Sequence, residues 1–234
     1  MVFKYKLVIL DYDLTLVNNI VDFYLSYTDA LNNTLGYTIS FNEFSKHLCS
    51  DKLDVFLKNV DKRRFWVLMR TFICYYNKSS ILNKHVERFL ETTSSFGLIN
   101  VIVSGKECHP EVIYRELELM GIRDYISRVY TFYDLNIHGG LEEVLFDKSW
   151  LLKKALIDHG VEPWQAVYIG DYIMDYYSSL KTGVDFIAYA ICDERLESFK
   201  ARGVKTIRDF NEALYIILSE NTSSLNQLSI YHHY

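Results

Sequence analysis

The chain has 234 residues, 50% of them hydrophobic and 24% charged, which is ordinary for one large globular domain or for a domain with a smaller one inserted. Its net charge of −5 provides no basic surface for nucleic acid, and no apolar run approaches the about 20 residues of a membrane span, so we expect neither partner and a cytoplasmic protein. The four cysteines, Cys49, Cys74, Cys108 and Cys192, form no C-x-x-C pair, and we expect reduced thiols rather than a zinc site or a disulfide framework.

The first predicted element is a short buried strand over residues 7–10, which ends in an acidic triplet. Asp11 and Asp13 follow this apolar run directly, and Thr15 comes two residues later. Residues two apart in an extended segment point to the same side, so the two carboxylates converge. Like charges held that close favour a shared cation, and Mg²⁺ suits oxygen ligands of this kind. The triplet therefore predicts half of a metal and phosphate site.

The next block is predicted to be helical. From about residue 18 to residue 90, apolar side chains recur at the helical period, as at Ile20, Phe23, Tyr27 and Leu31, and no strand pattern is evident. We interpret residues 17–85 as a helical cap domain inserted after the first strand.

The remainder alternates between strand and helix patterns. Strands are predicted over residues 99–103, 129–132, 166–169 and 185–189, with helices over 111–120, 149–160 and about 175–181. Strands alternating with helices of this length indicate a parallel sheet built from right-handed βαβ units. The predicted fold is therefore α/β, with a Rossmann-like parallel sheet flanked by helices in residues 1–16 and 86–234 and the helical cap in 17–85.

Three polar groups mark the later part of this pattern. Ser104 and Gly105 follow one predicted strand, Lys148 precedes a predicted helix, and Asp171 and Asp175 follow the strand that ends at Gly170. Each group alone is ordinary, since Ser-Gly is a common turn, a lysine is commonly exposed and an acid is favoured where a helix begins. Together with the acidic triplet they make up what a Mg²⁺-dependent phosphoryl-transfer site needs, because such chemistry rests on positioning and charge neutralisation.

This combination resembles the haloacid dehalogenase superfamily, in its phosphoglycolate phosphatase-like branch with a helical cap. The four signature motifs of that superfamily match Asp11-x-Asp13-x-Thr15, Ser104, Lys148 and Gly170-Asp171-x-x-x-Asp175. The resemblance implies a phosphoric monoester hydrolase with Mg²⁺ as its cofactor and a small phosphorylated metabolite as its substrate. Branches of the superfamily that dehalogenate or cleave phosphonates lack the second aspartate, so Asp13 favours phosphate esters.

The resemblance also implies a role for each matching residue. Asp11 would be the nucleophile that forms an aspartyl phosphate, and Asp13 the general acid and then the general base. Lys148 would fix Asp11 and screen charge. Phosphate binding falls to Thr15, Ser104, Gly105 and Lys148, and metal binding to Asp11, Asp13 through its main-chain carbonyl, Asp171 and Asp175.

Several positions depart from the usual pattern of the superfamily. Leu14 stands where Gly is common, and Ser149 follows Lys148 where Pro is usual. Tyr12 and Tyr172 flank catalytic positions, and we expect such bulky neighbours to reshape the pocket entrance.

The physiological substrate and the oligomeric state cannot be read from the sequence, and two other functions stay open. A sugar phosphomutase of the same fold would return the phosphoryl group to its substrate, and a catalytically silent relative would only bind a phospho-ligand. Cations of the helical block that could meet a second anionic group are Lys52, Lys58, Lys62, Arg63, Arg64, Arg70 and Lys78, although each is expected on a solvated helix face.

Overall fold

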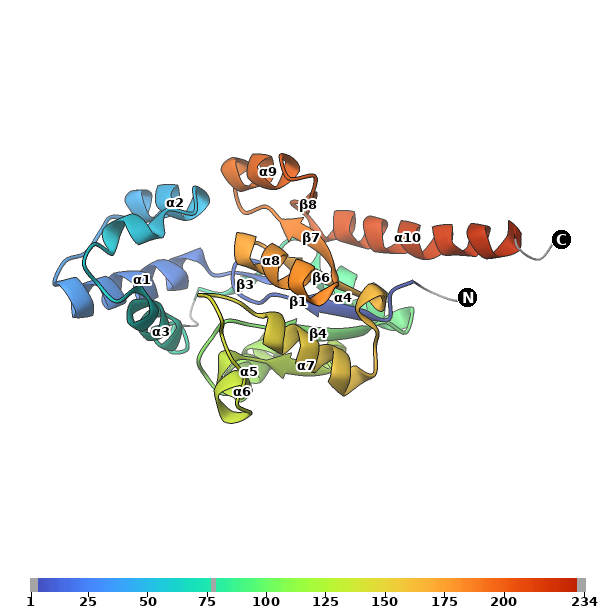
Figure 1. The fold of residues 1–234 in the computed structure, drawn as a ribbon, viewed down its shortest axis with the longest axis horizontal. Helices are drawn as coiled ribbons and strands as arrows, with labels where there is room; N and C mark the ends of the chain where they lie inside the picture. The colour runs from blue at the N-terminus through green and yellow to red at the C-terminus, as the bar shows by residue number, and fades with distance from the viewer. Residues whose placement is uncertain (1–3, 77–78, 231–234) are drawn as a thin grey trace.

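A six-stranded parallel sheet forms the centre of the molecule (Figure 1). The computed structural model describes residues 4–76 and 79–230, with only the backbone described for 221–230. The strand order is β5-β4-β1-β6-β7-β8, and every pairing in this sheet is parallel. The strands are β1 (Leu7–Leu10), β4 (Ile99–Val103), β5 (Arg128–Tyr130), β6 (Ala166–Gly170), β7 (Asp185–Tyr189) and β8 (Lys205–Ile207). Since β1 lies between β4 and β6, the polar residues that follow these three strands are neighbours.

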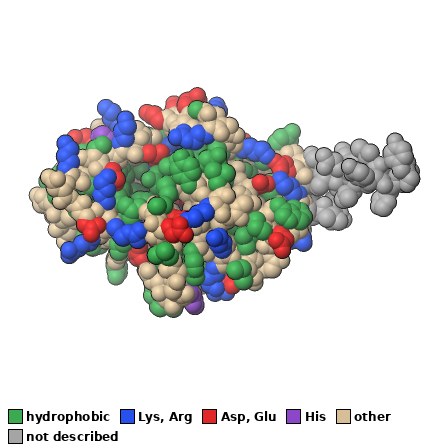
Figure 2. Space-filling model, viewed as in Figure 1, with side chains coloured by type: hydrophobic (Ala, Val, Ile, Leu, Met, Phe, Trp, Pro, Cys, Tyr) green, Lys and Arg blue, Asp and Glu red, His purple; other side chains and the backbone are tan. Residues whose placement is uncertain are grey.

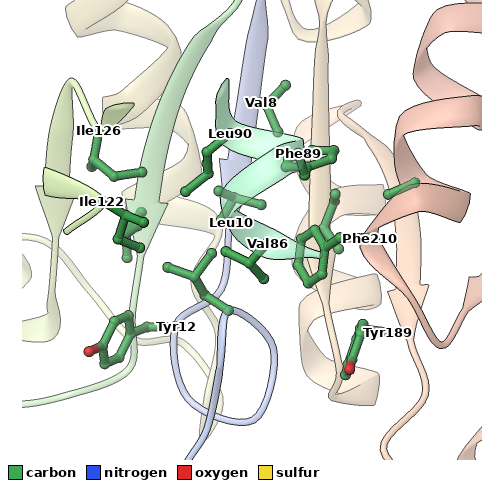
Figure 3. Packing of buried hydrophobic residues seen from close by; sticks show 14 of the residues in the cluster. Val8, Leu10, Tyr12, Val86, Phe89, Leu90, Ile122, Ile126, Tyr189 and Phe210 are labelled. Atoms are coloured by element: carbon green, nitrogen blue, oxygen red, sulfur yellow. The ribbon is translucent and has the colours of Figure 1, made fainter. Parts of the chain in front are cut away.

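Helices cover both faces of the sheet, because the central strands are apolar on both sides. On one face, Val8 and Leu10 of β1 pack with α4 (Val86–Ser95), α5 (Glu111–Leu119) and α10 (Phe210–Ile230), as Figure 3 shows in part. On the other face, Leu7 and Ile9 pack with α6 (Phe132–Ile137) and α7 (Ser149–His159), which lies against α8 (Ile173–Thr182). Helix α9 (Asp193–Lys200) contacts the sheet through Phe199, whose ring lies 6.1 Å from that of Phe186 in β7. Short 3₁₀ turns lie at η2 (Arg123–Tyr125) and η3 (Pro163–Gln165).

A group of helices lies beyond the carboxyl ends of the strands, at the left of Figure 1. It consists of α1 (Ile20–Leu35), α2 (Phe41–Cys49), η1 (Leu53–Phe56) and α3 (Lys62–Phe72), and we call residues 20–76 the helical insertion. Ser40 starts α2 with a reciprocal capping box to Glu43, and Asp61 caps α3 by accepting from Arg64 N–H. The insertion has its own apolar cluster, in which Tyr27 contacts Phe65 and Trp66.

The predicted fold class is confirmed, and two local predictions are corrected. The predicted absence of strands in residues 18–90 is wrong, because β2 (Val17–Asn18) pairs antiparallel with β3 (Ile81–Leu82). Strands of two residues are too short to produce an alternating sequence pattern, so β2 and β3 are revealed only by their backbone pairing. Strand β8 was also missed, because Lys205 and Thr206 leave it only one buried residue. The assignment of 17–85 to a separate cap domain stays a prediction, with β2 and β3 near its two ends.

The cysteines are paired, so the prediction of reduced, unpaired thiols is wrong. Disulfides join Cys49 to Cys192 and Cys74 to Cys108. Both link the helical insertion to the sheet-bearing part of the chain, because Cys49 ends α2, Cys74 follows α3, Cys108 follows β4 and Cys192 precedes α9. The partners are 143 and 34 residues apart, and no local spacing signal reports contacts made only in the tertiary fold.

Along residues 4–76 and 79–230, no helix combines the length and the apolar character needed to cross a bilayer.

Candidate active site

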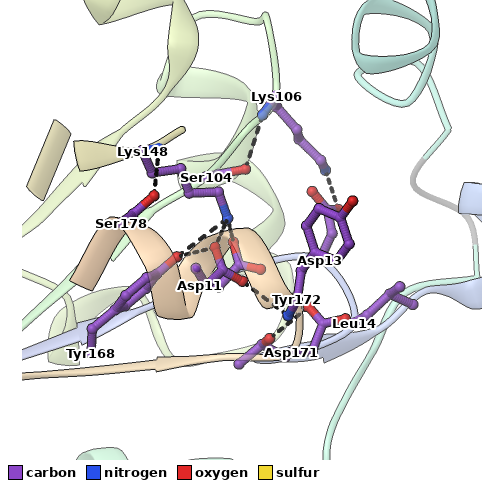
Figure 4. Close-up of polar contacts among 12 residues, drawn as sticks. Asp11, Asp13, Leu14, Ser104, Lys106, Lys148, Tyr168, Asp171, Tyr172 and Ser178 are labelled. Atoms are coloured by element: carbon purple, nitrogen blue, oxygen red, sulfur yellow. Dashed lines mark hydrogen bonds and ion pairs between the residues drawn. The ribbon is translucent and has the colours of Figure 1, made fainter. Parts of the chain in front are cut away.

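The site is built at the carboxyl edge of the sheet, where three neighbouring strands end in polar residues. Asp11 follows β1, Ser104 follows β4 and Asp171 follows β6. Main-chain hydrogen bonds fix these ends in register: Asp11 N–H donates to Ile169 O at 2.9 Å, and Ser104 N–H donates to Tyr130 O at 2.9 Å. Ligands of open α/β sheets bind at this edge. Residues predicted to act together are thus brought together by sheet order (Figure 4).

Lys148 bridges two of the buried carboxylates. Its Nζ lies 2.6 Å from Asp11 Oδ1 and 2.9 Å from Asp175 Oδ1, and Tyr168 OH donates to the same Asp175 oxygen at 2.7 Å. Burial raises the pKa of Asp11, although the Lys148 ammonium opposes that shift. Burial also works to lower the pKa of Lys148, but the facing carboxylates outweigh it and raise that pKa. Lys148 is therefore held charged, with its ammonium on the predicted nucleophile.

Asp171 is held from two sides. The Thr15 hydroxyl donates to its Oδ1 at 3.1 Å, and Arg195 of α9 binds both its Oδ2 and its main-chain oxygen. Burial raises the pKa of Asp171 to about 6, against the lowering influence of the Arg195 guanidinium. Arg195 also donates to Leu48 O at 3.1 Å and to Asp51 Oδ1 at 2.9 Å, so one guanidinium joins the acidic site to the helical insertion.

Gly170 is required by the close approach of Asp175. A Cβ at position 170 would lie 2.7 Å from Asp175 Oδ2 and 2.9 Å from its Cγ, closer than such atoms pack. Asp175 is fixed there because it is the third residue of α8, where its Oδ2 accepts from Tyr172 N–H at 3.1 Å. The Gly-Asp-x-x-x-Asp spacing thus places Asp175, near the start of α8, directly against Gly170 at the end of β6.

The carboxylates of Asp11, Asp171 and Asp175 form a buried group that fits a divalent cation. One oxygen from each lies within 4.8 Å of the others, and each residue is at most 5% exposed. Three carboxylates face two cations, Lys148 and Arg195, which leaves one formal negative charge buried. Hard oxygen donors with excess negative charge are the environment that Mg²⁺ prefers. The Asp13 side chain lies outside this group.

Asp13 lies at the edge of the site with an unusual set of partners. Its Oδ1 accepts from Asn19 Nδ2 at 2.6 Å and lies 3.3 Å from Lys106 Nζ. Asn19 also accepts from Leu14 N–H, and Leu14 has φ +62°, a left-handed conformation that a side chain makes costly. Glycine is common at this position because it adopts the left-handed conformation without strain. In this chain the hydrogen bond from Leu14 N–H to Asn19 helps hold Leu14 in that conformation.

Two predicted phosphate-binding groups are already engaged within the protein. The Thr15 hydroxyl is on Asp171, and the Ser104 hydroxyl oxygen accepts from Lys106 N–H at 3.2 Å. Both residues are fully buried, whereas Gly105 lines the adjoining cavity together with Asp11 and Lys148. The phosphate-binding roles of Thr15, Ser104 and Gly105 stay predictions.

Sequence reasoning missed Lys106, Arg195 and Tyr168, and misjudged Tyr12. Lys106 carried a weak signal, since it follows Ser104 by two residues, but Arg195 is 24 residues from Asp171 and had none. The expectation that Tyr12 shapes the pocket entrance is wrong. It is fully buried beneath the sheet edge, and its hydroxyl donates to Glu116. Tyr172 does line the cavity, with its ring 5.4 Å from that of Phe146.

The sequence matches one family model along most of its length. Residues 8–189 match the model described as haloacid dehalogenase-like hydrolase. No curated protein matches the chain.

Solved structures share this fold at low sequence identity. A predicted phosphoglycolate phosphatase from Haemophilus somnus is 21% identical, with a TM-score of 0.63 over 91% of this chain and 98% of that one. A predicted phosphatase from Clostridium acetobutylicum is 17% identical, with a TM-score of 0.68 over 92% and 99%. A haloacid dehalogenase-like family hydrolase from Streptococcus pneumoniae is 18% identical, with a TM-score of 0.67 over 91% and 98%. At sequence identities this low, the structural similarity shows a shared fold and nothing further.

Proposed function

This chain belongs to the haloacid dehalogenase-like hydrolases, and we propose that it is a Mg²⁺-dependent phosphatase that hydrolyses a small phosphorylated metabolite through an aspartyl-phosphate intermediate. The observation that carries the proposal is the buried Asp11 carboxylate, which is ion-paired with Lys148 at 2.6 Å, is grouped with Asp171 and Asp175, and lines a cavity together with Asp171. Such a carboxylate is shielded from water and held in one orientation, as a nucleophile must be.

We assign the covalent steps to Asp11 and Asp13. An Asp11 oxygen bonds to phosphorus as the bond from phosphorus to the leaving oxygen breaks, and Asp13 protonates that leaving oxygen. Water then attacks phosphorus, Asp13 takes the proton from it, and Asp11 is released with inorganic phosphate. Asn19 and Lys106 support this assignment, since both hold Asp13 Oδ1 and leave the carboxylate in the cavity lining.

We assign the metal to the carboxylates of Asp11, Asp171 and Asp175 and to the main-chain carbonyl of Asp13. Mg²⁺ would neutralise charge on the phosphoryl oxygens. Lys148 keeps Asp11 oriented, and Arg195 holds Asp171. Thr15, Ser104, Gly105 and Lys148 are proposed to surround the phosphoryl group. We also propose a cytoplasmic location, and a likeness to phosphoglycolate phosphatases in the type of reaction and not in the substrate.

The test is a phosphate-ester panel assayed with Mg²⁺ and with EDTA, with inorganic phosphate as the measured product. We expect phosphate release that EDTA abolishes and that Asp11→Asn lowers at least about a thousandfold. Asp124→Asn, which alters an exposed aspartate that does not line the cavity, is the matched control and should keep wild-type activity. An isomerised sugar phosphate in place of free phosphate would indicate a mutase, and full activity in Asp11→Asn would refute the proposal.

A further inference from the structure

A cavity of about 400 Å³ lies between the carboxyl edge of the sheet and the helical insertion. This volume is within the range of small-molecule sites. Its charged floor includes Asp11, Asp13, Lys148 and Asp171. Figure 2 shows hydrophobic side chains gathered near the middle of the molecule on the face in view, with charged side chains around them. The wall opposite the floor decides which group attached to the phosphate can fit.

That wall is mainly apolar. The apolar side chains that the helical insertion contributes are Phe23, Leu48, Leu53, Trp66, Met69 and Ile73. Its charged lining residues are Arg70, Asp51, which binds Arg195, and Asp54, which accepts from Trp66 Nε1 at 2.9 Å and pairs with Lys62. The segment before α7 adds Val144, Leu145 and Phe146, and the Phe146 ring meets Trp66 edge-on with centroids 4.9 Å apart. An apolar wall of this kind favours the binding of apolar ligand groups, because binding removes apolar surface of both the ligand and the protein from water.

The one cation of the helical insertion that lines the cavity is neutralised. Arg70 binds Glu142 Oε1 at 2.6 Å and Oε2 at 3.2 Å, and it also lies 2.9 Å from Glu107. Glu142 in turn accepts from Phe146 N–H at 2.6 Å, which fixes the aromatic wall. Freeing Arg70 for a ligand anion would break a buried bidentate pair and release the segment that carries Phe146.

The other cations of the lining also lie against two carboxylates each, although Lys106 Nζ meets its two by charge alone and donates no hydrogen bond to a described residue. Lys148 faces Asp11 and Asp175. Arg195 binds Asp171 and Asp51, and Lys106 lies between Asp13 and Glu116. Carboxylates outnumber cations in every one of these groups, so the lining that the described residues provide has no charge to spare for a second anion.

The remaining cations of the helical insertion do not reach the cavity. Among the described residues Lys46 is exposed and absent from the lining, and so are the five predicted candidates Lys52, Lys58, Lys62, Arg63 and Arg64. Lys78 lies outside the described residues. The hypothesis that a cation of this block meets a second anionic group is therefore unsupported for these five, and Arg70 is occupied.

We propose that the substrate is a phosphate monoester whose alcohol part is uncharged and mainly apolar, seated between Trp66, Met69 and Phe146. This inference rests on the proposed phosphatase function and narrows its substrate class. It sets the chain apart from an enzyme that acts on phosphoglycolate. The carboxylate of phosphoglycolate would face the apolar side chains and the Arg70–Glu142 ion pair, and would find no free cation there.

The first experiment follows kcat/KM along ethyl, butyl and hexyl phosphate with Mg²⁺. The leaving oxygens of these esters are chemically alike, so differences report contacts of the alkyl chain. Each buried methylene should raise kcat/KM by about two- to fourfold until the cavity is filled. A flat or falling series, with ethyl phosphate hydrolysed normally, overturns the inference while the phosphatase proposal stands. No hydrolysis of any ester overturns both.

The second experiment compares isobutyl phosphate with 2-phosphoglycolate, which have nearly the same shape but differ by one negative charge. Wild type should favour isobutyl phosphate at least about tenfold in kcat/KM. Val144→Lys adds a cation at a lining residue that is 54% exposed, and it should narrow that ratio at least about threefold, whereas Val144→Gln should leave it unchanged. Preference for 2-phosphoglycolate in wild type, or equal ratios in both variants, overturns the inference.

Discussion

The disulfides give the clearest quantitative prediction, because they tie the helical insertion to the rest of the chain. Cys49–Cys192 closes a loop of 143 residues and Cys74–Cys108 one of 34. In the chain-entropy account, these closures remove about 5 and about 4 kcal/mol of unfolded-state freedom, respectively. The loops are nested, so the second bond to form closes a shorter loop than its separation suggests. Together they stabilise the oxidised protein by less than the two values added.

The perturbation is Cys74→Ser with Cys108→Ser, which removes one bond and leaves no odd cysteine. A loss of about 4 kcal/mol corresponds to a decrease in Tm of about 8–16 °C for a chain of this size. Calorimetry of the oxidised wild type and variant measures it, and thiol titration in denaturant counts the bonds. Reduction should lower the Tm of wild type further than that of the variant, since two bonds are lost instead of one.

The refuting result is four titratable thiols in the oxidised wild type and a Tm that reductant does not change. Disulfides are uncommon in a reducing cytoplasm, so the same titration on protein extracted under thiol-blocking conditions also tests the proposed location.

Three substitutions test the site itself. Gly170→Ala places a Cβ 2.7 Å from Asp175 Oδ2, so the apparent Mg²⁺ affinity in an activity titration should decrease about 10–100-fold; unchanged affinity would contradict the packing argument. Lys148→Met leaves the Asp11 and Asp175 carboxylates buried without their ammonium, which should lower the free energy of unfolding by about 3–5 kcal/mol. Unfolding in EDTA measures this loss, and a variant as stable as wild type would contradict it. Asp13→Asn should slow steady-state alkyl phosphate hydrolysis about 10²–10⁴-fold, but in single-turnover mixing with p-nitrophenyl phosphate it should slow p-nitrophenol release much less, because that leaving group needs no proton and departs before water attacks; equal losses would argue against an acid role.

The strands and their terminal acids were predictable because both signals are local. Leu7–Leu10 and Ala166–Gly170 are short apolar runs, and the strand-end rule places Asp11 and Asp171 side by side once the strands are parallel. The orientation of Tyr12 was predictable by the same logic and was missed. The alternation that aligns Asp11 with Asp13 sends Tyr12 to the other side, with Val8 and Leu10, where the structure places it.

The groups that only the tertiary fold brings together could not be predicted. Arg195 reaches Asp171 and Leu48 O from a helix whose sequence shows no pattern for that task. The cysteine pairs and the Arg70–Glu142 pair likewise join segments that are far apart in the chain. These contacts position the residues that line the cavity, so the proposed substrate class rests on tertiary packing and not on the motifs.

Acid-quench trapping of the phosphorylated enzyme would show whether Asp11 is the nucleophile. Protein is mixed with ³²P-labelled substrate and Mg²⁺, quenched at early times, and digested to find the labelled peptide. We expect a hydroxylamine-labile label on Asp11, at most one per chain, that decays at the rate of phosphate release and is absent in Asp11→Asn. Turnover without any label on the protein, or a label on another residue, would contradict it.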